Sequence, residues 1–524
     1  MTLALAKSEV SKILTRIVMN DNQINPASIK KNLTQLPATT IAKCNNDVLN
    51  SLLDDVRPVY FPAVVYPEVQ ELMKRIAEET DKAEMERVAL IIKRFKVTER
   101  QKYVVIIEQL LEIAAERRWG ICKNATFTFL YNGCYWNLLD REVLQKFLGD
   151  SAERMDLPKY EARQYTVREN LYKQFLVTGF LPMPDINDKL LINLRNGTFE
   201  IGKDGKGWLR EFDETDFLKY QLPFDYDPKA TCPLFHKYLD VSLPDKESQN
   251  VLAEFVGYAF APHLKLEKAL FLYGNGRNGK SVFYDIVTAL MGVQNVSCYS
   301  IDSLCDSTGY YRAMIANKLV NYSSEVGKKI NADIYKQLCS GEAVEARLPY
   351  GDPFLIRNYA RLIFNANTLP PDPEQTKAYY DRFLIIPFTV TIPTENRDID
   401  LAKKIINSEL SGVFNWVLEG LDRVIRQKGF SECKAAEIEL ERYRAESDSV
   451  QMFIEECDYK KSTTLSMLLK DLYTDYRCFC LENGYRICSL KTVSGRLKNK
   501  GFEVIKGAGA RIILIEKIED GRPL

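Results

Sequence analysis

The sequence is poor in histidine, in paired cysteines and in long apolar runs. Its 524 residues include only two histidines, and its 12 cysteines are scattered without a Cys-x-x-Cys pair. Cys478 and Cys480 stand too close together to clamp a metal by themselves, so the sequence does not predict a zinc site. Cysteines used in this way are typical of reduced, cytosolic proteins, where most of them pack into cores.

Two further absences limit the kind of protein this is. No run of about 18 apolar residues and no secretory leader pattern occurs, so nothing in the sequence points to a membrane or to secretion. Lysine plus arginine number 71, and aspartate plus glutamate also number 71, which leaves no net charge. Any affinity for nucleic acid must therefore come from a local basic surface. The length suffices for about three or four domains, each with its own core.

What the sequence does contain is a Gly-x-x-x-x-Gly-Lys-Ser motif at residues 274–281. An apolar run over 269–273 has the length of a buried parallel strand, and apolar residues at helical spacing follow over 282–291. On such a strand-to-helix turn, backbone N–H groups point at phosphate oxygens, and the helix adds the positive end of its dipole. The motif therefore predicts a nucleotide site; the alternative is a coincidental glycine-rich turn.

Each residue of this loop has an expected role. Lys280 is expected to reach the β- and γ-phosphates, and the Ser281 hydroxyl to ligate Mg²⁺. The residues predicted to contact the nucleotide are Gly274, Asn275, Gly276, Arg277, Asn278, Gly279, Lys280 and Ser281.

Three polar residues downstream stand at or beside the ends of apolar runs. Glu325 and Asn367 each close a run, and Arg382 immediately precedes another. Because ligands collect at the carboxyl ends of parallel strands, Glu325 is a candidate for polarising an attacking water, and Asn367 for holding that water or reading the γ-phosphate. Taken singly, Glu325 is equally a surface carboxylate, Asn367 a turn residue and Arg382 a partner of solvent or nearby acids. Their order along the chain favours a joint catalytic site.

This order of loop, Glu, Asn and Arg resembles that of superfamily-3 helicases, in the poxvirus, phage and plasmid primase-helicase branch. The likeness extends from about residue 120 to about residue 390. The stretches that carry it are LINLRNGTFE (191–200), YQLPFDYDP (220–228), CPLFHKYL (232–239), FLYGNGRNGKS (271–281), YKQLCSGEAVEARLPYGDPF (335–354), IFNANTLPP (363–371) and DRFLIIPF (381–388). The resemblance implies an AAA+-like core that hydrolyses ATP with Mg²⁺.

Two departures from the family pattern affect the catalytic residues. Many members place two acidic residues after the second strand, whereas here Ser324 precedes Glu325. Either Glu325 serves both metal and water, or Mg²⁺ keeps more of its own waters; Ser281 and Glu325 are the predicted metal ligands. The family often has paired arginines before the fourth strand, but here Asp381 takes the first place. Arg382 alone is then the expected arginine finger, acting on the ATP of a neighbouring subunit.

The resemblance also implies a ring, a hexamer, that threads one DNA strand past a hairpin between the second and third strands. Here that hairpin is expected over residues 346–358. Arg347, Tyr350 and Arg357 are candidates for backbone and stacking contacts with single-stranded DNA. A solvated surface turn is the alternative for each of the three.

The predicted fold is an α/β multidomain protein with a P-loop, AAA+-like parallel-sheet ATPase core. The expected order is a helical N-terminal region of unknown role (1–115), a small α/β domain that precedes the helicase domain (116–235), the superfamily-3 helicase ATPase domain (236–445) and a winged-helix DNA-binding domain (446–524). Relatives often carry a primase in the first region. Both histidines lie outside it and no zinc pattern is present, so primase activity is not expected in this chain.

The winged helix is predicted from a helix over 465–483, a second helix capped by Ser489, and paired strands over 502–505 and 510–515. The wing is expected over 506–511. Such a domain binds DNA largely through phosphates, although some winged helices bind proteins instead. The predicted DNA-contacting residues here are Lys491, Arg496, Lys498, Lys500 and Arg511.

Together these patterns predict an ATP-dependent replicative DNA helicase of a phage, prophage or plasmid, located in the cytoplasm of a bacterial host. The resemblance implies 3′-to-5′ movement on single-stranded or forked DNA, and a separate primase or initiator as partner. An ATP-regulated, DNA-binding initiator or assembly platform with little unwinding of its own is the alternative. A small-molecule kinase is disfavoured by the arrangement of Asn367 and Arg382.

Overall fold

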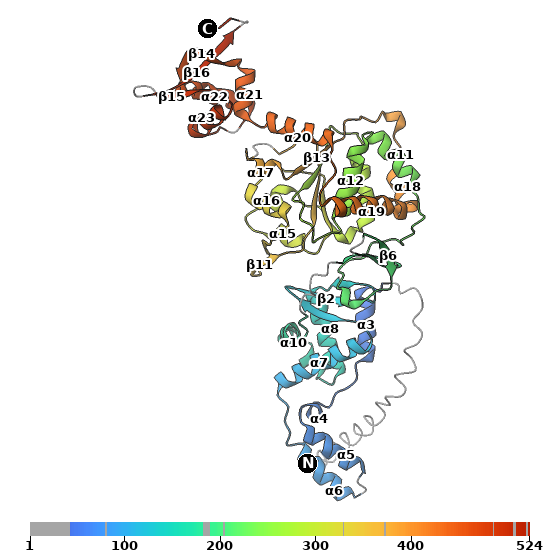
Figure 1. The fold of residues 1–524 in the computed structure, drawn as a ribbon. Helices are drawn as coiled ribbons and strands as arrows, with labels where there is room; N and C mark the ends of the chain where they lie inside the picture. Colours follow the sequence, from blue (N-terminus) through green and yellow to red (C-terminus); the bar gives the residue numbers. More distant parts are fainter. Residues whose placement is uncertain are drawn as a thin grey trace. The chain divides into compact units, whose positions relative to one another are not determined.

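The computed structural model divides the chain into two compact units, residues 1–226 and 227–524, each described by itself below (Figure 1). The structure describes residues 42–78, 81–181, 189–202, 205–327, 330–370, 374–485, 487–506, 510–519 and 522–523. Residues 1–41 of the expected helical N-terminal region lie outside the described residues.

The first unit is mainly helical at its start, and its helices build two cores. Thr98 begins the longest of its helices with a capping box, in which Thr98 and Gln101 each pair with the other's backbone N–H. One core joins α3 (Asn45–Asp55), α7 (Glu99–Glu116), α8 (Arg141–Arg154) and α10 (Tyr165–Thr178). A smaller core joins α4 (Phe61–Val65), α5 (Pro67–Glu78) and α6 (Lys82–Ile92). The larger core contains Leu110 from before residue 115 and Leu130 from after it, so it crosses the expected domain boundary.

Two antiparallel sheets of three strands complete the first unit. They are β1 (Ile121–Asn124), β2 (Phe127–Tyr131) and β3 (Trp136–Leu138), and β4 (Leu190–Leu194), β5 (Gly197–Ile201) and β6 (Gly207–Arg210). Arg195 and Asn196 form the turn between β4 and β5, since Leu194 pairs with Gly197 in the ladder.

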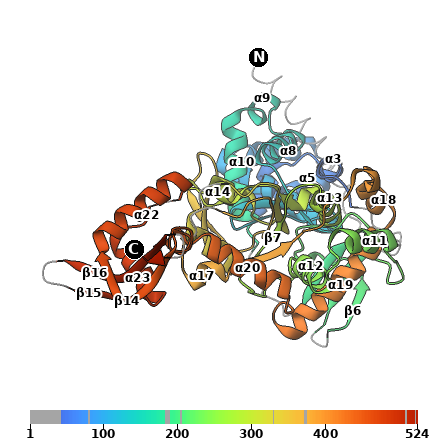
Figure 2. The same cartoon turned by 90° about the horizontal axis from the view of Figure 1, so that it is seen from above.

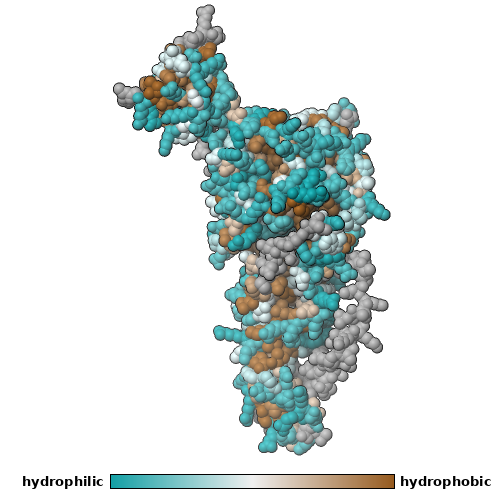
Figure 3. Space-filling model, viewed as in Figure 1, coloured by the Kyte–Doolittle hydropathy of each residue, from teal (hydrophilic) through white to brown (hydrophobic). Residues whose placement is uncertain are grey.

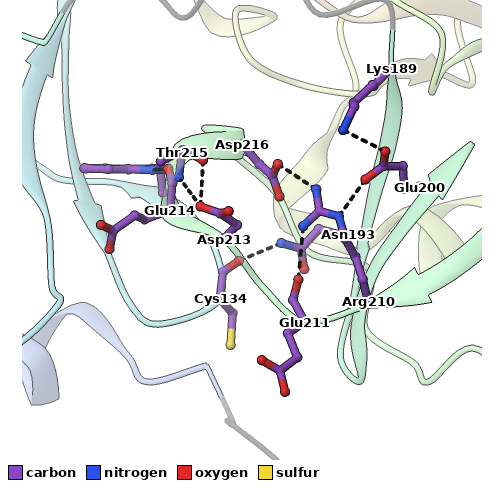
Figure 4. Close-up of polar contacts among 11 residues, drawn as sticks. Cys134, Lys189, Asn193, Glu200, Arg210, Glu211, Asp213, Glu214, Thr215 and Asp216 are labelled. Carbon is purple, nitrogen blue, oxygen red and sulfur yellow. Dashed lines mark hydrogen bonds and ion pairs between the residues drawn. The ribbon is translucent and has the colours of Figure 1, made fainter. Parts of the chain in front are cut away.

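A buried ion-pair network ties the second of these sheets to the segment that follows it (Figure 4). Arg210 donates to Glu200 and to Asp216, both at 2.7 Å, and Lys189 lies 2.9 Å from Glu200. The Glu200 side chain is only 6% exposed, and its hydrogen bond with Arg210 is the leading cause that lowers its pKa. Charges this well buried are tolerated because each has a partner.

The second unit is built on the parallel sheet that the sequence predicts. Its strand order is β13-β7-β12-β9-β8, and every pairing is parallel. The strands are β7 (Ala269–Tyr273), β8 (Val296–Ser297), β9 (Val320–Ser323), β12 (Arg361–Ala366) and β13 (Phe383–Pro387). The central three are almost fully buried, as expected of parallel strands covered on both faces. The parallel α/β core is therefore confirmed.

Helices surround this sheet. Among them α12 (Lys246–Tyr258) lies along α19 (Leu410–Gln427) (Figure 2). The others in this region are α11 (Pro233–Ser242), α13 (Lys280–Met291), α14 (Ile301–Leu304), α15 (Tyr310–Met314), α16 (Ala332–Ser340), α17 (Lys377–Tyr380), α18 (Leu401–Ser408) and α20 (Lys434–Glu446).

The C-terminal part of this unit has its own core (Figure 2). It consists of α21 (Ser449–Glu456), β14 (Tyr459–Leu468), α22 (Leu469–Asn483), α23 (Leu490–Asn499), β15 (Val504–Lys506) and β16 (Arg511–Glu519). We call it the C-terminal segment. Ser489 caps α23 as predicted, accepting a hydrogen bond from the N–H of Thr492 at 3.2 Å.

Two expectations for the C-terminal segment were wrong in detail. The helix expected from residue 465 begins at Leu469, because residues 465–468 continue β14, which pairs with β16. β15 and β16 each begin slightly later than expected. Residues 507–509 of the expected wing lie outside the described residues.

The surface of the second unit drawn in Figure 3 is mostly hydrophilic, with smaller apolar areas. Within the described ranges, no helix is both long and apolar enough to cross a membrane.

Candidate active site

The glycine-rich loop, residues 274–279, lies at the carboxyl end of β7, an interior strand of the sheet. Its first residue donates from the N–H of Gly274 to the carbonyl of Ala366 on β12, at 3.1 Å. On the other side, Asn278 Nδ2 donates to the carbonyl of Phe388, just beyond β13, at 2.9 Å. A Cβ at Gly274 would stand 2.3 Å from that same carbonyl oxygen. The loop is thus held between the two strands that flank β7, which leaves no room for a side chain at its start.

Lys280 and Ser281 open helix α13 directly after the loop. The helix is capped by Gly279, whose φ of +89° suits glycine. Lys280 Nζ donates to the carbonyl of Gly274 at 2.5 Å and to Asn278 Oδ1 at 3.1 Å. The lysine is 6% exposed, and this burial lowers its pKa. Ser281 is exposed.

Glu325 and Asn367 lie at the same edge of the sheet as the loop. β12 stands between β7 and β9, with Ala366 opposite Tyr273 and Phe364 opposite Ser323. Asn367 therefore follows the strand adjacent to the loop, while Glu325 follows the next strand out, about 10 Å from β7 at the usual strand spacing. Both side chains are exposed at this edge.

Arg382 does not lie with the other predicted catalytic residues of the chain. It immediately precedes β13, and Phe383 is opposite Ala269 at the start of β7. The length of the five-residue strand, about 16 Å, separates it from the loop.

The guanidinium of Arg382 is held by three neighbours at this edge. It lies 2.8 Å from a Glu267 carboxylate oxygen, and donates to the Ala378 carbonyl at 3.1 Å and to the Ser340 hydroxyl at 3.3 Å. Its Nε is buried and has no hydrogen-bond partner among the described residues. The partner of Arg382 is thus Glu267, which the sequence analysis did not single out.

The hairpin expected between the second and third strands is confirmed. β10 (Val344–Arg347) and β11 (Pro353–Ile356) pair antiparallel, with Arg347 opposite Pro353. Tyr350 stands at the tip, fully exposed, with a φ of +58°. Arg347 is exposed and donates from Nε to the Gly351 carbonyl at 2.8 Å. Arg357 is exposed directly after β11.

Two tyrosines beside this hairpin were not singled out in the sequence analysis. Tyr310 and Tyr311, on α15, are 37% and 42% exposed. The buried Arg312 ties their helix to the hairpin by donating to the Glu345 carbonyl at 2.7 Å. The backbone N–H of Arg347 also donates to the carbonyl of the residue before α15, at 3.2 Å. Neighbouring aromatics are as frequent in cores as on surfaces, so no sequence signal distinguishes this pair.

The cationic residues predicted to contact DNA fall into two groups in the C-terminal segment. Arg496 and Lys500 are half-buried and face Asp448, at 3.2 and 2.7 Å. Lys491, Lys498 and Arg511 are exposed. The structure therefore leaves the second group open to a ligand, while the single carboxylate of Asp448 offsets part of the charge of the first.

The donor set at the loop edge suits Mg²⁺, which prefers hydroxyl and carboxylate oxygens and keeps several of its own waters. Ser281 and Glu325 supply such oxygens. In the described part of the chain, no group of three or more His, Cys, Asp or Glu side chains is placed to hold a metal by itself. A metal here would need oxygens from a bound nucleotide as well.

Comparison with known families gives two matches. Residues 272–382, which include the loop, Glu325, Asn367 and Arg382, match a model described as a family of unknown function, DUF5906. Residues 105–244 match the model described as D5 N terminal like.

Among solved structures, the chain is similar to apo forms of the NrS-1 C terminal region. One shares 13% identity, covers 77% of this chain and 98% of its own, and gives a TM-score of 0.42. Another shares 14% identity, covers 79% and 99%, and gives 0.43. TM-scores this low do not establish a common fold.

Proposed function

We propose that this protein is an ATP-hydrolysing motor that moves along single-stranded DNA and unwinds it during replication. The observation that carries the proposal is the division of the predicted catalytic residues between two edges of one sheet. Glu325 and Asn367 stand with the glycine-rich loop, and Arg382 stands at the opposite edge. A chain arranged in this way completes its site only when a second copy brings its Arg382 to the first copy's loop.

The residues at the loop edge divide the chemistry among them. Backbone N–H groups of the loop and the positive end of α13 bind the phosphates. Lys280 exchanges the Gly274 carbonyl for phosphate oxygens, whose negative charge stabilises the ammonium group that burial disfavours. Ser281 and Glu325 would hold Mg²⁺, which would supply positive charge against the phosphates. Asn367 orients the attacking water, and Glu325 accepts its proton.

Arg382 of a neighbouring copy then stabilises the charge that develops on the transferred phosphoryl group. Arg382 immediately precedes β13, and the residue directly after that strand, Phe388, has its carbonyl held by Asn278 of the glycine-rich loop. Within one copy, β13 thus connects Arg382, which acts on the ATP of a neighbouring copy, to the glycine-rich loop, which binds that copy's own nucleotide. This connection supports hydrolysis that is coupled around a ring, which the family resemblance implies to be hexameric.

DNA contacts are assigned to the hairpin and to the C-terminal segment. Tyr350 is placed to stack on bases, and Arg347 and Arg357 to meet phosphates, on an element anchored to the motor through α15. The resemblance implies 3′-to-5′ movement, a phage, prophage or plasmid origin, and a separate primase or initiator as partner.

A second candidate is an ATP-regulated initiator or assembly platform with little unwinding of its own. The exposed cations Lys491, Lys498 and Arg511 favour it, because duplex binding by the C-terminal segment needs no contribution from the hairpin. The two functions differ in what happens when the hairpin is altered: loss of unwinding with ATP binding intact indicates the motor.

The deciding experiment is ATP-dependent unwinding of forked DNA with defined 3′ and 5′ tails, by native protein, Lys280→Ala and Arg382→Ala. Both variants are also mixed with native protein. Arg426→Ala, which alters an exposed ion pair on α19, is the control. Unwinding from a 3′ tail, lost in both variants and suppressed in mixtures, is expected. ATP hydrolysis with no unwinding of any fork would exclude the motor function and favour the initiator or assembly platform.

A further inference from the structure

Helix α11 forms a wall behind the glycine-rich loop, and no role was expected for it. Its Tyr238 hydroxyl donates to the carbonyl of Gly279, the last residue of the loop, at 2.9 Å. Tyr238 is 4% exposed, and burial raises its pKa, so the phenol stays a proton donor. Gly279 also caps α13, so Tyr238 acts on the junction between the loop and the helix.

The wall is fixed from its far end. Glu409 is 6% exposed and accepts hydrogen bonds from the N–H groups of Leu234 and Phe235, both at 3.0 Å. These N–H groups belong to the first turn of α11 and have no acceptor within the helix. The positive end of the helix dipole also stabilises a carboxylate at this position. The Phe235 ring packs edge-on against Trp416 of α19 at 5.0 Å. A helix clamped in this way presents Tyr238 to the loop in one orientation.

Ser242, one turn after Tyr238, has a buried hydroxyl. The residue is 1% exposed, and its Oγ has no hydrogen-bond partner among the described residues. A Cβ at Gly279 would lie 2.6 Å from this Oγ, so the hydroxyl is directed at the loop. Leaving a buried hydroxyl unpaired is costly, and such a group needs an explanation.

We propose that Tyr238 and Ser242 are positioning residues for the polyphosphate of a bound nucleotide. Tyr238 holds the Gly279 carbonyl away from the phosphates, so that the loop turns its N–H groups toward them. Ser242 donates its hydrogen bond to the loop in the nucleotide-bound form, when the loop tightens around the phosphates. The inference rests on the nucleotide site of the proposed function.

The test is binding of a non-hydrolysable ATP analogue with Mg²⁺, measured together with the melting temperature of the nucleotide-free protein. For Ser242→Ala we expect a threefold to tenfold weaker Kd with an unchanged or higher melting temperature, because the unpaired hydroxyl is gone. Tyr238→Phe is expected to weaken the Kd by a similar factor. A role confined to stability would shift the melting temperature and leave the Kd unchanged.

Tyr359→Phe is the matched control. Tyr359 is also buried, and its hydroxyl donates to the Glu342 carbonyl at 2.9 Å, away from the loop. It should bind the analogue like the native protein. If Ser242→Ala and Tyr238→Phe also bind like the native protein, the inference is overturned. If the native protein itself binds no analogue, the proposed function fails with it.

Discussion

Arg382 and Glu267 form an ion pair of 2.8 Å at the edge of the sheet opposite the glycine-rich loop. Glu267 is 46% exposed, whereas Arg382 is 18% exposed. A pair with one exposed partner contributes little to stability, about 0–1 kcal/mol. A polyphosphate carries more charge than one carboxylate and is therefore able to compete for the same guanidinium.

Glu267→Gln should make Arg382 more available to a neighbouring copy. We expect ATP hydrolysis at protein concentrations below half-saturation to rise about twofold to fivefold, the equivalent of less than about 1 kcal/mol. The Kd for nucleotide should not change, since Glu267 is far from the loop of its own chain. Steady-state hydrolysis against protein concentration gives the answer, with Arg382→Ala as the inactive reference. A fall in activity would mean that Glu267 supports the finger rather than competing for it.

Gly279→Ala and Gly276→Ala should differ in stability. The first places a Cβ 2.6 Å from Ser242 Oγ at a φ of +89°, whereas a Cβ at Gly276 meets nothing within 4 Å. We expect Gly279→Ala to lower the free energy of unfolding by about 1–3 kcal/mol, and Gly276→Ala to change it by less than about 0.5 kcal/mol. Denaturant unfolding of the two variants is the measurement. Equal effects would contradict the geometry of the loop.

Because of the buried Lys219, the stability of the first unit should increase as the pH rises from about 8 to 10.5. Burial lowers its pKa from 10.5 to about 8, although its Nζ lies 4.7 Å from the Phe129 ring centroid and 5.0 Å from that of Phe217. The native state therefore loses this proton before the unfolded state does. The resulting penalty is fully present below pH 8 and is relieved as the pH rises toward 10.5.

Lys219→Met should accordingly be more stable than native protein at pH 7, by about 1–3 kcal/mol, and the difference should shrink between pH 8 and 10.5. Burial raises the pKa of the nearby Cys122 to about 12, which gives the opposite pH dependence. It is present in both proteins and largely cancels in the difference. Denaturant unfolding across this range checks the prediction. Lys173→Met, at a lysine that is 68% exposed, should show no such trend.

Asp448→Asn should strengthen DNA binding by the C-terminal segment. The change removes the carboxylate that partly offsets the charges of Arg496 and Lys500, while an asparagine still caps α21. We expect tighter binding of duplex DNA at about 0.1 M salt. The slope of the logarithm of the binding constant against the logarithm of the salt concentration should become steeper by about one to two. Fluorescence anisotropy over a salt series measures both. In contrast, Lys498→Ala should reduce the slope by about one. An unchanged slope in Asp448→Asn would show that the two cations do not reach phosphate.

Tyr350→Ala should weaken single-strand binding without affecting the fold. The side chain is fully exposed at the hairpin tip, so its removal costs no packing. Stacking on one base is worth about 1–3 kcal/mol, which predicts a loss of affinity of about 5-fold to 150-fold for an oligonucleotide. Tyr160→Ala, at another tyrosine that is 82% exposed, is the matched control and should bind normally. Equal binding by both variants would show that the tip of the hairpin does not contact DNA.

The sequence predicted most of the sheet because its strands are local patterns. Buried parallel strands appear as short continuous apolar runs, and a glycine-rich loop between a strand and a helix has few other uses. Ser489 as a helix cap is equally local, because it acts on an N–H three residues away. The start of α22 was misplaced because residues 465–468 belong to a strand whose partner, β16, lies about 50 residues further along.

Sequence alone therefore determined the glycine-rich loop, the order of the polar residues after it and the hairpin between two strands, since each depends on neighbours in the chain. Only the tertiary structure decided that Arg382 lies a strand's length from the loop, because that follows from the parallel direction of β13 and β7. It likewise decided that Glu267 holds Arg382, that Asp448 pairs with a cation of α23 and with the one directly after it, and that Tyr238 and Ser242 stand behind the loop. Such contacts join residues distant in the chain, and no local pattern records them.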